Sequence, residues 1–344
     1  MNILILGGGV FLGPAVLDAA LARGHAVSVF NRGRSRAVWP APVELLHGDR
    51  QTDLSALAGR RWDAVVDTCG YTPDDMRPAV QQLQACSQYL FVSSISAYAS
   101  FEAVGQDEAA PLAPFDGIAS GDPDMAHYGA QKAACEAVLR EARGERALIV
   151  RPGLIVGRGD PTGRFSYWPW RATGSGAMLV PASMEGGLQF IDERDFAEWM
   201  LMLLEARAAG PFNATGPVGA GCSWADLASA CVLAAARHGH APAQPCFVDE
   251  SALRAQGVLP WSELPLWIPA SDTASRGFMR VSIRRAQQHG LRTRPLADTL
   301  DAILAEGVPA PDDARRKGKL TREREADVIA AATSGTHSVP GDEA

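Results

Sequence analysis

Residues 3–22 read ILILGGGVFLGPAVLDAALA. Ile3–Leu6 is an apolar run typical of a buried strand, and apolar residues at helical spacing follow from Ala15 to Ala22. Glycine stands at positions 7, 8, 9 and 13, directly between the two. A strand, a glycine-rich turn and a helix in this order let the backbone approach a phosphate group, which the helix N-terminus attracts. The stretch therefore predicts a dinucleotide-binding turn.

The alternation of strand and helix continues over the first 150 residues. Further apolar runs predict strands at 26–30, 43–46, 64–66, 89–92 and 147–150. Strands that alternate with helices at this interval are typical of a doubly wound parallel sheet. Continuous rather than alternating hydrophobicity fits strands that are covered on both faces. We therefore expect an α/β fold of the Rossmann type.

The composition changes after Arg151. Residues 156–185 are rich in Gly, Pro and aromatic residues, and two predicted helices, separated by a loop rich in Pro and Trp, follow within 218–309. The expected units are a Rossmann domain (1–155 and 186–217), a smaller C-terminal substrate-binding lobe (156–185 and 218–309) and a charged, partly disordered tail (310–344). Four aromatic residues are expected either to line a substrate crevice or to form the core of the lobe: Phe165, Tyr167, Trp168 and Trp170.

Composition and charge narrow the class of protein. The chain is 47% hydrophobic and 21% charged, as in globular proteins. It has no apolar run long enough for a membrane helix and no signal-peptide pattern, so we expect a cytoplasmic protein without a membrane partner. A net charge of −7 argues against a nucleic-acid partner. The six cysteines lack C-x-x-C spacing, so we expect no metal site. A homodimer is compatible with the sequence.

One lysine stands out from the basic residues. Of the 32 Lys and Arg residues only three are lysines, and Lys132 is the only lysine before Lys317. Arginine serves as well on most solvated surfaces, so an isolated lysine suggests a role that arginine cannot fill. Lys132 lies four residues after Tyr128, on the same face of a predicted helix. An ammonium group nearby favours the phenolate and lowers the pKa of a tyrosine, which makes Tyr128 a candidate acid–base catalyst.

The segment after the second strand bears on cofactor preference. NAD-binding proteins usually carry an acid there, which binds the ribose 2′-hydroxyl. In this chain the segment is Asn31-Arg32-Gly33-Arg34-Ser35-Arg36, and arginine binds a phosphate with two parallel hydrogen bonds. The segment favours NADP over NAD, although NAD and a merely solvated basic loop both stay open.

Several motifs together resemble the short-chain dehydrogenase/reductase superfamily. They are the glycine turn, Phe91-Val92-Ser93-Ser94-Ile95-Ser96-Ala97-Tyr98, Tyr128-x-x-x-Lys132 and Arg151-Pro152-Gly153. The sequence is most similar to the extended branch, the NAD-dependent epimerases and dehydratases, over about residues 1–305. Its glycine spacing, G-G-x-x-x-x-G, resembles an atypical subgroup that includes reductases, epimerases and RNA-binding proteins. Where the branch usually has Asn after the fourth strand, this chain has Asp67-Thr68-Cys69-Gly70-Tyr71.

The resemblance implies a set of site residues. The catalytic residues would be Ser94, Tyr128 and Lys132, although Ser93 and Ser96 are close enough in sequence to take the place of Ser94. The expected cofactor-binding residues are Gly7, Gly8, Gly9, Phe11, Leu12, Gly13, Asn31, Arg32, Arg34, Asp49, Thr68, Lys132 and Pro152.

The resemblance also implies a reaction class. The leading interpretation is an NAD(P)-dependent oxidoreductase that transfers hydride at a ketone or secondary alcohol. The alternative is an epimerase of a nucleotide sugar or a related metabolite. Dehydration is disfavoured because Ser94-Ile95-Ser96 replaces the Thr-Asp-Glu of sugar dehydratases. A non-catalytic, RNA-binding protein is a further alternative, and the negative net charge argues against it.

Overall fold

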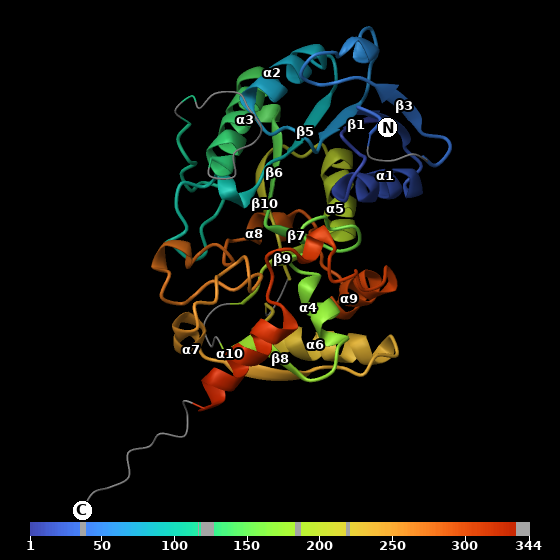
Figure 1. The fold of residues 1–344 in the computed structure, drawn as a ribbon. Coiled ribbons are helices and arrows are strands. Elements are labelled where there is room, and N and C mark those ends of the chain that lie inside the picture. The colour runs from blue at the N-terminus through green and yellow to red at the C-terminus, as the bar shows by residue number, and fades with distance from the viewer. Residues whose placement is uncertain (35–38, 116, 118–126, 183–186, 218–220, 335–344) are drawn as a thin grey trace, which may run out of the picture. The chain divides into compact units, whose positions relative to one another are not determined.

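The structure, a computed structural model, describes residues 1–34, 39–115, 117, 127–182, 187–217 and 221–334. The chain divides into two compact units (Figure 1). Unit 1 contains Met1–Ile155, Gln189–Gly219 and Arg280–Thr293, and unit 2 contains the remainder. Along the described part of the chain, no helix combines the length and the apolar character needed to cross a bilayer.

Unit 1 is built on a seven-stranded parallel sheet. Its strands are β1 (Asn2–Leu6), β2 (Ala26–Asn31), β3 (Glu44–His47), β4 (Ala64–Asp67), β5 (Gln88–Val92), β6 (Leu148–Pro152) and β10 (Gly210–Ala214). The order is β10-β6-β5-β4-β1-β2-β3, and every neighbouring pair is parallel. The strands β7 (Leu154–Val156) and β9 (Phe190–Asp192) form a separate two-stranded sheet. The predicted Rossmann-type doubly wound sheet is confirmed.

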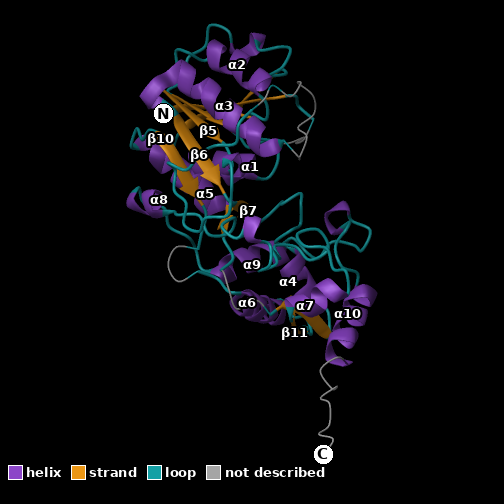
Figure 2. Ribbon diagram, turned by 90° about the vertical axis from the view of Figure 1, so that its left-hand side faces the viewer, coloured by secondary structure: helices purple, strands orange, loops and turns teal. Residues whose placement is uncertain are grey.

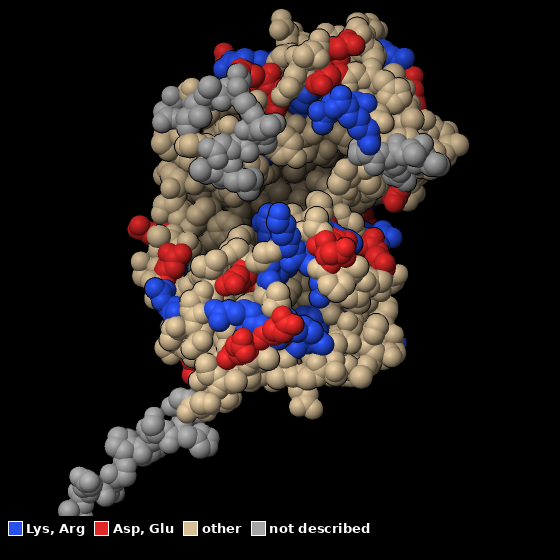
Figure 3. Space-filling model, viewed as in Figure 1, with Lys and Arg blue, Asp and Glu red and all other residues tan. Residues whose placement is uncertain are grey.

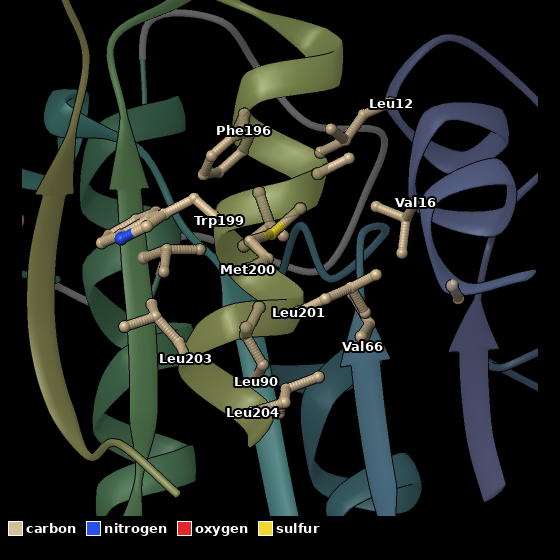
Figure 4. Close-up of a cluster of buried hydrophobic side chains, with 14 of the residues drawn as sticks. Leu12, Val16, Val66, Leu90, Phe196, Trp199, Met200, Leu201, Leu203 and Leu204 are labelled. Atoms are coloured by element: carbon tan, nitrogen blue, oxygen red, sulfur yellow. The ribbon is translucent and has the colours of Figure 1, made fainter. Parts of the chain in front are cut away.

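Helices cover both faces of this sheet. The helices of unit 1 are α1 (Leu12–Ala22), α2 (Pro73–Gln82), α3 (Tyr128–Arg143), α5 (Glu193–Glu205) and the short α8 (Arg284–Gln288). Ile3 and Ile5 pack with side chains of α1 and α5 in one core, whereas Leu4 and Leu6 pack with α2 and α3 in the other. Figure 4 shows the first core, which contains Phe196 and Met200 of α5, Val16 of α1 and Val66 of β4. Apolar residues at successive strand positions are therefore needed because both faces are buried.

Unit 2 has its own small core. It contains β8 (Ala177–Pro181), β11 (Gln244–Val248), α4 (Tyr167–Ala172), α6 (Trp224–Arg237), α7 (Glu250–Ala255), α9 (Leu296–Ala305) and α10 (Arg322–Ser334) (Figure 2). The two strands pair in parallel. Trp168 is fully buried and its ring meets Trp224 edge-on at 4.8 Å. All four aromatic residues of the 165–170 segment are buried, which favours the lobe-core alternative over a crevice lining.

The division into units differs from the expected one in two places. Residues 280–293 group with unit 1 rather than with the lobe, because the Asn213 side chain donates to the Ser282 carbonyl and Trp199 donates to the His289 carbonyl. Residues 310–334 group with unit 2, where Glu325 pairs with Arg171. Residues 335–344, which we expected to be disordered, lie outside the described residues.

Candidate dinucleotide and catalytic site

The glycine turn depends on residues without a Cβ atom. Gly7 and Gly8 have φ values of 101° and 76°, in the region that only glycine adopts readily. A Cβ on Gly13 would lie 2.3 Å from the Cα of Gly8, so the start of α1 touches the turn directly. This contact explains the G-G-x-x-x-x-G spacing: the second glycine supplies the turn and the last one allows the helix to approach it.

A cavity of about 990 Å³ lies at the carboxyl ends of β1 to β4. Eight of the expected cofactor-binding residues line it: Gly7, Gly8, Gly9, Asn31, Arg32, Arg34, Asp49 and Thr68. The volume is at the upper end of the usual range for ligand sites. Ligands of open parallel sheets bind outside the carboxyl ends of the strands, which is where this cavity lies.

The other expected cofactor-binding residues are not part of the cavity lining. Phe11 precedes α1 with a positive φ of 50°, and Leu12 and Gly13 are buried in the first turn of the helix. Pro152 ends β6, away from the four strands that form the cavity. Lys132 is buried, and its Nζ atom lies 5.3 Å from the ring centre of Tyr71, which does line the cavity.

The segment after β2 presents two arginines to the cavity. Asn31 ends β2, where NAD-binding proteins usually carry an acid. Its side-chain amide donates to the Gly7 carbonyl (3.3 Å) and accepts from the Gly33 N–H (2.7 Å). Arg32 and Arg34 line the cavity and are exposed. Ser35 and Arg36 lie outside the described residues. Positive charge is therefore available at this edge of the cavity.

Sequence reasoning missed a buried ion pair in the cavity wall. Arg50 follows Asp49 and pairs with Asp67 at the end of β4, with Nη1–Oδ1 and Nη2–Oδ2 distances of 2.7 and 2.9 Å. The Tyr89 hydroxyl also donates to Asp67 (2.7 Å). Burial alone would raise the pKa of Asp67, but Arg50 and Tyr89 lower it below its usual value. The sequence contained one signal of this pair, because Asp67 is a charged residue at the end of a buried strand. Its partner Arg50 could not be identified, because their proximity depends on the order of the strands.

Lys132 has its ammonium group inside unit 1. The residue is 2% exposed, and Nζ donates to the Gly70 carbonyl (2.8 Å) and to the Val92 carbonyl (2.7 Å). These carbonyls follow β4 and end β5, so Lys132 reaches the carboxyl edge of the sheet from α3. Burial lowers the pKa of Lys132 to about 8. A buried lysine whose pKa is shifted in this way is characteristic of functional sites.

Tyr128 and Ser94 lie on neighbouring elements. Tyr128 is the first residue of α3, and Ser94 precedes the single-turn helix η2 (Ile95–Ala97). A Cβ on Gly129 would lie 2.0 Å from the Ser96 carbonyl oxygen, so α3 begins in direct backbone contact with η2. The Ser94 hydroxyl accepts from the Ser96 N–H (3.1 Å), and both Ser94 and Tyr128 are half-buried.

Ser93 has a different role from Ser94. Its hydroxyl donates to Glu136 (2.7 Å), a fully buried residue of α3. Glu136 also binds Arg151 through two hydrogen bonds of 2.8 and 2.7 Å, and Arg151 is 1% exposed. This network joins β5, α3 and β6 behind Ser94. The Ser93 hydroxyl is therefore bound to Glu136 inside unit 1. Arg151, the arginine of Arg151-Pro152-Gly153, has a structural role as the ion-pair partner of Glu136.

Comparison with known proteins agrees with this architecture. Residues 76–215 match the model of the NAD dependent epimerase/dehydratase family. The chain is 29% identical over 172 residues to the chloroplast stem-loop binding protein of 41 kDa b from Arabidopsis thaliana, covering 45% of this chain and 42% of the relative. It is 31% identical over 163 residues to 2′-dehydrokanamycin reductase from Streptomyces kanamyceticus, covering 45% and 43%. The matches thus span less than half of each curated relative.

The fold is similar to that of solved epimerase structures. The UDP-Glc/GlcNAc 4-epimerase of Campylobacter jejuni aligns with a TM-score of 0.64 and 16% identity, over 88% of this chain and 98% of that one. At this identity the likeness concerns the fold alone.

Proposed function

From the match of residues 76–215 to the model of the NAD dependent epimerase/dehydratase family, we propose that the protein is a member of that family and an NAD(P)-dependent oxidoreductase acting on a ketone or a secondary alcohol. The observation that carries this proposal is the convergence at one sheet edge of the glycine turn, its cavity and the buried Lys132. The reductase relative supports reduction over epimerisation.

The residues of the cavity fit a dinucleotide. The turn at Gly7 and Gly8 offers backbone without Cβ atoms, and α1, whose N-terminus no side chain caps, begins directly after the turn, where a helix N-terminus attracts a pyrophosphate. Arg32 and Arg34 fit a 2′-phosphate, and we propose a preference for NADP(H) over NAD(H) on that basis. The cofactor supplies or accepts the hydride when bound.

The protein's own residues handle the proton. Tyr128 donates a proton to the carbonyl oxygen as the adjacent carbon receives hydride, which turns the ketone into a secondary alcohol. Ser94 donates a hydrogen bond to the same oxygen and orients it. Lys132 has three N–H groups, two of which donate to Gly70 and Val92, and the third would hold the cofactor ribose. The positive charge of Lys132 also favours the phenolate of Tyr128.

Tyr128→Phe tests this assignment. The substitution removes the proton donor and keeps the ring, so turnover with a panel of ketones and NADPH should fall roughly 100- to 10,000-fold. The dissociation constant of NADPH, measured by calorimetry, should change little. A variant that retains most of its turnover would contradict the role of Tyr128.

Further assays separate the alternatives. An epimerase would retain its cofactor through purification and convert a nucleotide sugar without net consumption of NADPH. An RNA-binding protein would shift a stem-loop RNA in a gel and consume no cofactor. Basic and acidic side chains are interspersed on the face shown in Figure 3, without one continuous basic field, which supports the enzyme over the RNA-binding protein.

A further inference from the structure

Arg50 differs from the other two arginines of the cavity in its exposure. Arg32 and Arg34 are exposed, whereas the Arg50 side chain is 10% exposed and is held against Asp67, which is fully buried. All three line the same cavity. The contribution of Arg50 to ligand binding depends on which parts of its guanidinium group are not already bonded to the protein.

The donors of Arg50 are all engaged by the protein. Arginine has five N–H groups in one plane. Nε donates to the Asp75 carbonyl (3.2 Å), Nη1 to Asp67 (2.7 Å) and to the Cys69 sulfur (3.1 Å). Nη2 donates to Asp67 (2.9 Å) and to the Asp75 carbonyl (2.9 Å), and the Met76 sulfur lies 3.7 Å from it. Because these groups engage the N–H donors, which point outward in the guanidinium plane, the surface that Arg50 can present to the cavity is a face of that plane.

The partners of Arg50 hold this plane rigidly. Asp67 ends β4 and accepts a further bond from Tyr89, and Asp75 lies in the first turn of α2. The Gln51 side chain donates to the Asp75 carboxylate (2.8 Å), which ties the segment after β3 to α2. A preorganised planar cation loses little conformational entropy when an aromatic ring stacks on it.

We propose that the face of the Arg50 guanidinium is the platform on which the adenine base of the cofactor stacks. Guanidinium planes stack readily on nucleobases. Arg50 therefore recognises the flat base and makes no bond to a phosphate, whereas Arg32 and Arg34 bind phosphate through their N–H groups. The assignment rests on the proposed function, because it takes the cavity to be the cofactor site.

Arg50→Lys tests the platform. Lysine keeps a cation beside Asp67 and removes the flat face. Affinities for AMP, NADH and NADPH should fall by one common factor of about three to thirty. Affinities for ribose 5-phosphate and nicotinamide mononucleotide, which lack adenine, should stay unchanged. Arg60→Lys is the matched control, since Arg60 forms a surface pair with Glu44 in unit 1 and should bind every ligand as wild type does.

The outcomes separate the two proposals. If wild type binds neither NADH nor NADPH, the proposed function fails. If wild type binds them and Arg50→Lys binds AMP as tightly as wild type, the function stands and the platform is wrong. A fall in NADPH affinity alone would assign Arg50 to the 2′-phosphate and would also overturn the platform.

Alkylation of Cys69 tests the same point without a variant. The Cys69 sulfur contacts Arg50 and lines the cavity, so a base stacked on Arg50 should shield it. AMP should slow iodoacetamide labelling of Cys69, measured by peptide mass spectrometry, and ribose 5-phosphate should not. Cys246 in unit 2, which is also half-buried, is the internal control. Equal labelling of Cys69 with and without saturating AMP would overturn the platform.

Discussion

Lys132 holds a charge in surroundings that disfavour it. Two carbonyl oxygens and the rings of Phe91 and Tyr71, at 4.5 and 5.3 Å, surround its ammonium group. Hydrogen bonds to carbonyls and contacts with ring faces compensate for lost hydration only in part. Burial is therefore the largest cause of the lowered pKa, with Arg50 acting in the same direction and Cys135, Asp67 and Cys69 opposing it.

This pKa predicts a pH dependence for cofactor binding. A lysine with a lowered pKa carries its charge below that value and loses it as the pH rises through it. With a pKa of about 8, the affinity of the free protein for NADPH should be constant below pH 8 and decrease above it. Calorimetric titration across this range measures the effect. Lys132→Arg, which stays charged throughout, should lack the inflection, and an inflection that persists in this variant would assign it to another group.

Arg32 and Arg34 determine the predicted preference for NADP(H). A charge-assisted hydrogen bond to a phosphate contributes about 1.5 to 3 kcal/mol, so NADPH should bind roughly ten- to a hundredfold more tightly than NADH. Both arginines line the cavity, so one can replace the other. The double variant Arg32→Ala/Arg34→Ala should abolish most of the difference and leave NADH binding unchanged. Equal affinities of the two cofactors in wild type would show that these arginines do not select the cofactor.

At the scale of elements, the placement of α3 brings the proposed catalytic residues together. Its first residue is Tyr128, its second is the glycine that contacts η2, and Lys132 and Glu136 follow at intervals of four. Residues four apart share a helix face, so Lys132 and Glu136 both point toward the sheet. Glu136 fixes the helix to Arg151 of β6 and to Ser93. The helix α3 is therefore fixed at two points, by the contact of Gly129 with η2 and by the bonds of Glu136.

Gly129→Ala tests the contact between α3 and η2. The new Cβ would lie 2.0 Å from the Ser96 carbonyl oxygen, so the helix or the turn must move. Overpacking of this kind costs about 1 to 3 kcal/mol, and the same shift should separate Tyr128 from Ser94 and reduce turnover. Urea unfolding and steady-state kinetics measure the two effects. Gly187→Ala is the control, because its Cβ would meet no atom closer than 3.5 Å. Normal turnover in Gly129→Ala would show that the contact does not set the catalytic geometry.

At the scale of the whole molecule, the C-terminal segment is part of a folded unit. Glu325 of α10 is 2% exposed, pairs with Arg171 of α4 and accepts the Leu179 N–H of β8 (2.8 Å). Lys319 donates to the Thr162 carbonyl (3.0 Å). The charged composition of residues 310–334 therefore reflects buried pairing inside unit 2 in addition to solvated surface.

Glu325→Gln should destabilise unit 2. Removal of one partner of a buried ion pair leaves the other charge uncompensated, which costs about 3 to 5 kcal/mol of unfolding free energy. Chemical denaturation followed by the fluorescence of the buried tryptophans of unit 2 measures this loss. Glu323→Gln on the exposed side of α10 should change stability by less than about 0.5 kcal/mol. Equal stabilities of the two variants would mean that α10 does not contribute to the fold of unit 2.

Some of these features could be predicted from local pattern. Hydrophobic runs, helical spacing and glycines between strand and helix are properties of neighbouring residues, and they predicted the sheet and the turn. The beginning of α2 also has a local signal, because Thr72 and Asp75 form a capping box around Pro73. That signal was present in the sequence.

Local sequence pattern is sufficient to specify the Rossmann-type sheet, the glycine turn and the placement of Tyr128 and Lys132 on one helix, because each follows from a short period or a fixed spacing. The partners of the buried charges, by contrast, depend on the three-dimensional arrangement of the strands and helices. Arg50 meets Asp67, and Arg151 meets Glu136, because the order β6-β5-β4-β1-β2-β3 and the position of α3 bring segments together that are 17 and 15 residues apart. Burial selects such partners, since a charge removed from water requires an opposite charge within reach.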